Sequence, residues 1–230
     1  MNIKYLHHSG FSVETETKVL LFDYYTEGGR KAYFDPAAYG DKPIFVFVSH
    51  AHEDHYDRRI LDWAARYPQI RYILSDDVRT MAGFAGQAHH MEPHETLELD
   101  GISVRTLKSN DEGVAFLVKT DGKTIYHAGD LNWWHWNGES DVFNQEIAQS
   151  YTMEIDSLKG EGIDVAFVPA DLRLEDKYFW AADYFLRTIG AKLLFPMHFW
   201  GHFEVCEMLR EKEHGENIMK ITKENEAFTI

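Results

Sequence analysis

Short runs of apolar residues follow one another along the first half of the chain, and their spacing predicts β-strands. Apolar and polar positions alternate over residues 3–7, as they do in a half-buried strand. Residues 44–48 read Ile-Phe-Val-Phe-Val, an unbroken apolar run that is typical of a strand buried on both faces. Further strands are predicted at residues 11–14, 19–22, 71–74, 96–99, 102–108, 114–119 and 124–127.

Turn residues separate several of these runs. Asp-Gly pairs at 100–101 and 121–122 are strong hairpin signals, because this pair readily adopts the backbone of a tight two-residue turn. A further hairpin turn is expected at 17–18. Residues 24–43 are rich in glycine, proline and tyrosine and predict a long loop, a kind of segment that often serves as a functional lid.

Helical patterns become frequent only in the last third of the chain. They cover residues 139–159, 178–189 and 203–214, and earlier ones are predicted from a cap at Asp57 to near Pro68 and over residues 76–82. Strands are predicted between and after the late helices, at 163–168, 193–196, 219–221 and 227–230. Such an order favours sheets packed together with helices outside, rather than a doubly wound parallel sheet.

Composition narrows the class of protein. The 230 residues are 44% hydrophobic and 27% charged, which suits one globular domain over residues 1–230. With 23 basic and 38 acidic residues the net charge is −15, so the chain lacks the basic footprint of a nucleic-acid-binding protein. It contains no apolar run of membrane-spanning length and no signal peptide, which predicts a cytoplasmic protein without a membrane partner. Its one cysteine, Cys206, is expected to pack on a helix.

The strongest chemical signal lies directly after the apolar run 44–48. Residues 49–55 read Ser-His-Ala-His-Glu-Asp-His and hold four potential metal ligands, which are His50, His52, Asp54 and His55. The first two could share one metal ion while the last two bind a second. Imidazole nitrogens and carboxylate oxygens suit Zn²⁺ best, with Mn²⁺ or Fe as alternatives.

This H-x-H-x-D-H pattern resembles the signature of the metallo-β-lactamase superfamily, and the resemblance covers most of the chain. Asp23 is similar to the family's first motif, an aspartate that organises the metal loop. Asp130, in His-Ala-Gly-Asp, resembles the fourth motif, a carboxylate that bridges two metals, and His198 resembles the fifth, a histidine on the second metal. The fold that the resemblance implies is α/β, a four-layer αβ/βα sandwich.

One motif departs from the family pattern. Where the third motif usually supplies a histidine to the first metal, residues 109–113 read Ser-Asn-Asp-Glu-Gly. Asp111 could substitute as an oxygen ligand, and Glu112 less readily; otherwise the first metal binds weakly or is absent. One or two ions per chain are therefore expected.

Other histidines are open to two interpretations. The segment around His8 is similar to an early Gly-His-x-x-Phe element of the lactonase-like branch, so His8 either approaches the metal site or occupies a strand-end turn. His89, His90 and His94 are expected at the surface. His127 either donates a proton to a leaving group or points into the core.

The resemblance implies a reaction in which a metal-activated water attacks the substrate. Asp54 would bind metal and orient the nucleophile, and His127 is the candidate acid. The tryptophans of residues 131–137 either form the wall of a substrate pocket or belong to a core or dimer patch.

The branch of the superfamily is narrowed by exclusion. Antibiotic hydrolysis is disfavoured because the chain has no signal peptide and carries Asp130 where many such enzymes have a cysteine. A nuclease is disfavoured by the acidic net charge. Redox chemistry is disfavoured because His52 stands where the related oxygen reductases carry glutamate. The prediction is a hydrolase of a small ester, lactone, thioester or phosphodiester. The alternatives are a weakly active or non-catalytic metal-binding ligand sensor and a structural domain with an incidental histidine cluster.

Overall fold

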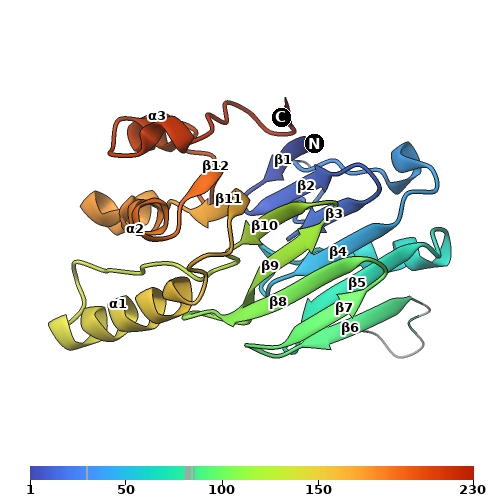
Figure 1. Ribbon diagram of the computed structural model, residues 1–230, viewed down its shortest axis with the longest axis horizontal. Coiled ribbons are helices and arrows are strands. Elements are labelled where there is room, and N and C mark those ends of the chain that lie inside the picture. Colours follow the sequence, from blue (N-terminus) through green and yellow to red (C-terminus); the bar gives the residue numbers. More distant parts are fainter. Residues whose placement is uncertain (30, 81–83, 85) are drawn as a thin grey trace. The chain divides into compact units, whose positions relative to one another are not determined.

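The computed structural model describes residues 1–29, 31–80, 84 and 86–230. The chain forms two compact units, a first unit of residues 1–92 with 223–230 and a second unit of residues 93–222. Each unit is built on one β-sheet (Figure 1). The assignment of all 230 residues to a single domain stays a prediction.

The first unit contains a seven-stranded sheet in the order β13-β1-β2-β3-β4-β5-β6. Its strands are β1 Asn2–His7, β2 Gly10–Glu14, β3 Val19–Phe22, β4 Ile44–Val48, β5 Ile70–Ser75, β6 Gln87–Met91 and β13 Ala227–Thr229. Neighbours pair antiparallel from β13 to β3 and parallel from β3 to β6. Strand β4 lies between β3 and β5 with all its residues buried, which confirms the interpretation of the apolar run.

The second unit contains a six-stranded sheet in the order β12-β11-β10-β9-β8-β7. Its strands are β7 Thr96–Leu99, β8 Ile102–Lys108, β9 Val114–Thr120, β10 Lys123–His127, β11 Ile163–Pro169 and β12 Ala191–Met197. Strands β10, β11 and β12 run parallel, whereas β7 to β10 form an antiparallel meander. Both sheets are therefore mixed, as expected of a chain that is not doubly wound.

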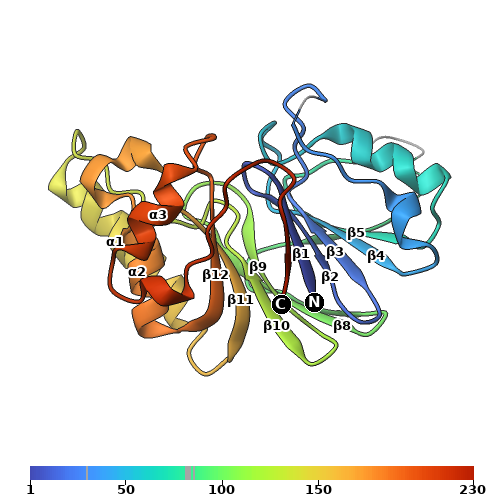
Figure 2. The same ribbon diagram turned by 90° about the horizontal axis from the view of Figure 1, so that it is seen from above.

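Three α-helices belong to the second unit, at the positions predicted for the last third of the chain. They are α1 Asp141–Asp156, α2 Trp180–Thr188 and α3 Glu204–Arg210. Figure 2 shows them together on one face of the sheet, beside β11 and β12. Cys206 is buried on α3, as predicted. Within the described residues, none of the helices has the length and apolarity needed to cross a bilayer.

Several predicted elements differ from the structure. Asp57 does cap a helix, but Arg58–Ala65 is a 3₁₀-helix, as are Pro36–Tyr39 in the predicted long loop, Leu172–Lys177 and Gly215–Asn217. The helix predicted over 76–82 is wrong for residues 76–80, which form a turn and an irregular stretch, while 81 and 82 lie outside the described residues. Residues 219–221 form no strand, because only the preceding Ile218 makes a β-bridge, to Leu194.

Both Asp-Gly pairs form the hairpin turns that the sequence predicts. Each residue of these pairs has a positive φ: 47° at Asp100, 81° at Gly101, 49° at Asp121 and 68° at Gly122. Two successive positive φ angles define the turn whose twist matches that of the flanking strands.

Replacing Gly122 with alanine should therefore reduce the free energy of unfolding by about 1 kcal/mol, because a residue with a Cβ is strained at such a φ. The loss would come from the backbone alone, since an added Cβ meets no atom of the described residues within 4 Å. Urea denaturation measures it. Gly138→Ala is the matched control, because this glycine has the same open surroundings without a positive φ. Equal effects of the two substitutions would contradict the prediction.

Candidate functional site

The histidine-rich segment follows β4 as predicted, and its position is set by the parallel pairing of β3 with β4. Parallel strands end at the same edge of a sheet, so Asp23, which follows β3, lies beside Ser49, which follows β4. The Asp23 backbone N–H donates to the Phe47 carbonyl oxygen across 3.0 Å, which continues the pairing by one residue.

Asp23 holds the histidine loop, which we define as residues 49–55. Its carboxylate accepts hydrogen bonds from the Ser49 backbone N–H at 2.8 Å and from the Ser49 hydroxyl at 2.7 Å. The Nδ1 atom of His55 lies 2.8 Å from Asp23 Oδ2, and both side chains are fully buried. Because a carboxylate only accepts, Nδ1 carries the proton and Nε2 becomes the coordinating nitrogen of His55. These contacts are the support for the loop that the sequence analysis expected of Asp23.

The histidine loop gathers potential ligand atoms within the first unit. One ligand atom each of His8, Asp54 and His55 lie within 4.8 Å of one another, and the same holds for the pair His50 and His55. His8 Nε2 is 3.3 Å from Asp54 Oδ2, so this histidine does approach the loop. The rings of His50 and His52 pack edge to face with centroids 4.6 Å apart. His52 is exposed, whereas His8, His50 and His55 are buried.

A second carboxylate stabilises the same loop. Asp77, in the turn after β5, accepts a hydrogen bond from the Ala51 backbone N–H at 2.8 Å. Asp77 was not identified from the sequence. The signal was a pair of aspartates directly after the strand that neighbours β4, in the segment wrongly predicted as a helix.

In the second unit, the residues of interest follow three adjacent parallel strands. Asp130 comes after β10, Asp171 after β11 and His198 after β12, so the three side chains meet at one edge of the sheet. His198 Nδ1 lies 2.9 Å from Asp171 Oδ2, and His198 Nε2 lies 3.5 Å from Asp130 Oδ1. The structure thus brings His198 and Asp130 together, as the sequence analysis expected.

Asp171 was not identified from the sequence. It is fully buried, and besides His198 it binds the Arg173 backbone N–H at 2.9 Å and the Arg173 Nε atom at 2.8 Å. Burial alone would raise its pKa, but the hydrogen bonds from His198 and Arg173 outweigh burial and lower the pKa to about 2. Asp171 is therefore ionised at neutral pH. The only signal in the sequence was one aspartate after a buried strand.

His127 is the last residue of β10 and is fully buried. Its Nδ1 atom accepts a hydrogen bond from the Gly129 backbone N–H at 3.1 Å. A nitrogen that accepts cannot carry the proton, so the neutral ring has its proton on Nε2. The ring also packs against Phe167, with centroids 5.8 Å apart.

The loop that lacks the expected third-motif histidine is tied to the segment after Asp130. Asn110 donates to the Asn132 carbonyl oxygen at 2.9 Å and accepts from the Asn132 backbone N–H at 3.2 Å. Asp111 is exposed, and one of its carboxylate oxygens lies within 4.8 Å of one from Asp130. Glu112 is exposed as well.

The tryptophans after Asp130 divide between two environments. Trp134 donates from Nε1 to the Asp130 carbonyl oxygen at 2.9 Å, and its ring meets that of His198 edge to face at 5.5 Å. Trp136 stacks parallel on Trp134 with centroids 6.1 Å apart. Trp133 instead packs against Trp180 among the helices. The core interpretation thus applies to Trp133, whereas Trp134 and Trp136 lie beside Asp130 and His198, and a role for them as the wall of a substrate pocket stays a prediction.

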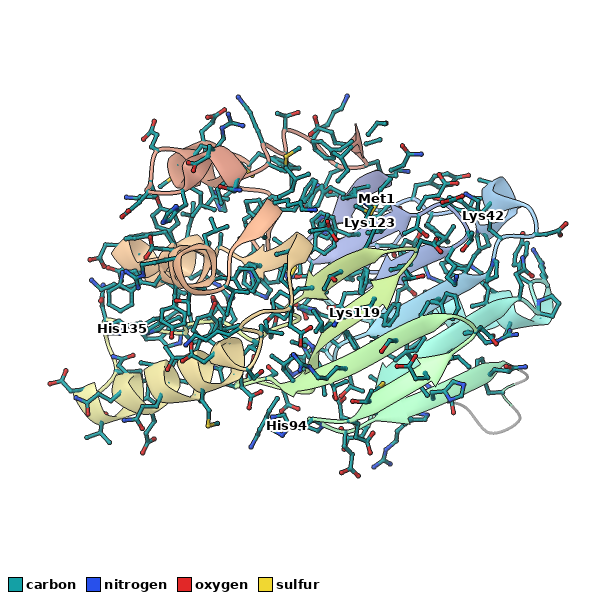
Figure 3. The ribbon with its side chains drawn as sticks, viewed as in Figure 1. Met1, Lys42, His94, Lys119, Lys123 and His135 are labelled. Carbon is teal, nitrogen blue, oxygen red and sulfur yellow. The ribbon has the colours of Figure 1, made fainter. Side chains whose placement is uncertain are left out.

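His89, His90 and His94 belong to none of the ligand clusters found among the described residues. His90 and His94 are exposed, as predicted, and His89 is half-buried on β6. Figure 3 shows His94 at the edge of the second sheet, where its Nε2 atom lies 2.9 Å from Glu154 Oε1.

The sequence is similar to one protein family and to several relatives that are described as metal-dependent hydrolases. A family model described as a β-lactamase superfamily domain matches residues 2–160. A UPF0173 metal-dependent hydrolase of Pyrococcus abyssi is 29% identical over 142 residues, which are 56% of this chain and 61% of the relative. Another, from Alkaliphilus metalliredigens, is 27% identical over 221 residues, or 86% of this chain and 85% of the relative. The match thus spans about three fifths of the Pyrococcus relative's length.

Solved structures show the same fold. That of a metallo hydrolase from the archaeon Ignicoccus hospitalis superposes with a TM-score of 0.67 over the whole of both chains, at 19% identity. The metallo-β-lactamase-fold protein YhfI of Bacillus subtilis gives 0.66 over 99% of each chain, at 16% identity. These likenesses confirm the predicted α/β fold class with two sheets.

Proposed function

The chain belongs to the metallo-β-lactamase superfamily, and from this premise we propose that it is a metal-dependent hydrolase of small molecules. The observation that carries the proposal is a repeated arrangement. In each unit a buried aspartate binds the Nδ1 atom of a histidine, Asp23 that of His55 and Asp171 that of His198. Metal-binding histidines almost always donate their second ring nitrogen in this way, because the contact orients the ring and raises its basicity.

The chemistry of the donor set fits a metal of the zinc type. The candidate ligands supply imidazole nitrogens and carboxylate oxygens, and the one thiol of the chain, Cys206, is buried on α3. Such a set suits Zn²⁺, and Mn²⁺ or Fe could replace it. The proposed ligands are His50, His52, Asp54, His55, Asp111, Asp130 and His198.

Asp111 takes the place of the missing third-motif histidine in this proposal. Its carboxylate and that of Asp130 approach within 4.8 Å, and two like charges at such a distance favour a shared cation. The paired hydrogen bonds between Asn110 and Asn132 hold the two loops in this arrangement.

When bound, the metal would act as a Lewis acid and lower the pKa of a water molecule. Asp54 would orient the attacking water. His127 would donate a proton to the leaving group from Nε2, since Nδ1 is occupied by the Gly129 N–H. The substrate class that we propose is a small ester, lactone, thioester or phosphodiester.

Metal content and turnover test the proposal together. Protein purified without a histidine tag should contain about two metal ions per chain, and it should hydrolyse at least one of four probes, a p-nitrophenyl ester, a γ-lactone, an acyl thioester and a bis-p-nitrophenyl phosphodiester. Asp111→Ala should reduce the content to about one ion and lower turnover by about 100-fold or more.

Asp41→Ala, which removes an exposed carboxylate from a turn, is the matched control and should change neither quantity. Absence of stoichiometric metal from the wild type would refute the proposal. A metal-loaded protein that binds metabolites but hydrolyses none of the probes would favour the ligand sensor.

A further inference from the structure

An open cavity of about 730 Å³ lies in the first unit, against the histidine loop. Its lining comes from the segment after β3, from residues 51–59 and from the turn after β5. The volume is in the range of pockets that bind small molecules. Because Ala51 and Glu53 belong both to the lining and to the histidine loop, a ligand in the cavity would lie next to the proposed metal ligands.

Three arginines line this cavity, and they differ in their partners. Arg59 is held by Asp57, with Nε 2.9 Å from Oδ1, and it also contacts Thr26. In the part of the chain that the structure describes, neither Arg58 nor Arg79 forms an ion pair. Since acidic residues outnumber basic ones by 38 to 23, two arginines without a carboxylate partner at one cavity are unexpected.

Two of the three carboxylates of the lining, Asp57 and Asp77, take part in other contacts. Asp57 accepts from Thr26 Oγ1 at 2.6 Å and binds Arg59, while Asp77 accepts from the Ala51 N–H. Glu53 is exposed to solvent. The three arginines and three carboxylates give the lining a formal net charge of zero. The chain as a whole carries a net charge of −15, so the lining is less negative than the average surface of the protein.

A buried hydroxyl group of the lining lies near Arg58. Tyr56 is 8% exposed, and its Oη atom is close to the Arg58 guanidinium but makes no hydrogen bond of normal geometry among the described residues. Buried polar groups are normally paired, so a hydroxyl group without a good hydrogen bond can take a partner from outside the chain.

We propose that this cavity binds an anionic group of the substrate, a carboxylate or a phosphate remote from the bond that is hydrolysed. Arg58 and Arg79 would pair with the oxygens of the group, because the planar guanidinium matches carboxylate and phosphate geometry, and the Tyr56 hydroxyl would donate a further hydrogen bond. The inference rests on the proposed function and narrows its substrate class to anionic esters, lactones, thioesters or phosphodiesters.

A pair of esters that differ only in a remote carboxylate tests the assignment. Arg58→Gln and Arg79→Gln should each raise KM for the anionic ester by about 10-fold or more, the usual effect of losing a charged hydrogen bond, and leave KM for the neutral ester unchanged. The matched control is Arg66→Gln, an exposed arginine at the end of the same 3₁₀-helix as Arg58 and outside the cavity. Equal changes for both esters would overturn the proposal.

Calorimetric binding of inorganic phosphate and of acetate separates this inference from the proposed function. Phosphate or acetate binding should be lost in the Arg58→Gln/Arg79→Gln double variant and retained in His198→Ala. Binding that is retained in the double arginine variant and lost in His198→Ala would show that the anion binds at the metal site, and it would overturn the proposal. If no ester is hydrolysed, the proposed function fails, and the arginine dependence of anion binding still decides the role of the cavity. The tighter of the two anions identifies the group as phosphate or carboxylate.

Discussion

Replacing Asp23 with asparagine is expected to lower the free energy of unfolding by about 3 kcal/mol and to remove most of the bound metal. The Asp23 carboxylate accepts from the Ser49 N–H, the Ser49 hydroxyl and His55 Nδ1, all of them buried. An amide keeps one acceptor oxygen, but its NH₂ group would face donors, so at least one buried donor loses its partner. Urea denaturation and metal analysis measure the two effects.

Asp41→Asn provides the control for this change, since that carboxylate is exposed in a turn. It should alter stability by less than about 0.5 kcal/mol. A wild-type metal content in Asp23→Asn would show that the loop keeps its conformation without the carboxylate, and it would contradict the role assigned to Asp23.

Asp171→Asn should weaken metal affinity by about 10-fold to 100-fold, the range found when the partner of a coordinating histidine is removed. With a pKa lowered to about 2, Asp171 is a carboxylate at neutral pH, and it holds His198 Nδ1 at 2.9 Å. The amide would no longer favour the tautomer that offers Nε2. Competition with a chelator of known affinity measures the change.

Asp176→Asn is the matched control for Asp171→Asn. Asp176 lies in the 3₁₀-helix Leu172–Lys177, which Asp171 caps, but it is exposed and pairs with Lys177 at the surface. Its replacement should leave metal affinity unchanged. An equal loss in both variants would point to a general disturbance of the helix rather than to the orientation of His198.

The parts of the fold that could be predicted are those where local chemistry and tertiary structure agree. The run at Ile44–Val48 is buried on both faces because it pairs with a strand on each side, and an unbroken apolar run is what such a strand requires. The Asp-Gly turns adopt the positive φ angles for which these residues are suited. The histidine loop was also evident, because its potential ligands are contiguous in sequence.

The missed elements depend on tertiary context. Strand β6, Gln87–Met91, is an edge strand with few apolar residues, so its hydrogen bonds to β5 are not foreshadowed by a hydrophobic pattern. The segment Arg58–Ala65 carries a helical pattern, but whether its turns are α or 3₁₀ depends on hydrogen bonds that one sequence does not reveal.

Dependence on tertiary context also explains why two residues of the candidate site were not found from the sequence. Asp77 follows β5 as one of a pair of aspartates, and Asp171 follows β11 as a single one. The significance of both depends on which strands are neighbours, β5 beside β4 and β11 beside β12. Only the strand order brings Asp77 to Ala51 and Asp171 to His198. The roles of Asp54, Asp111 and His127 stay predictions, because they concern a bound metal and a substrate.

Because Cys206 is buried, the reactivity of its thiol can be used to measure local opening of α3. It is the one thiol in the sequence, and it lies on α3 with no exposed surface. A thiol reagent can therefore react only when this short helix transiently opens, so the labelling rate gives the free energy of that opening without any engineered probe. Labelling no faster than global unfolding allows would show that α3 opens only when its surroundings unfold as well.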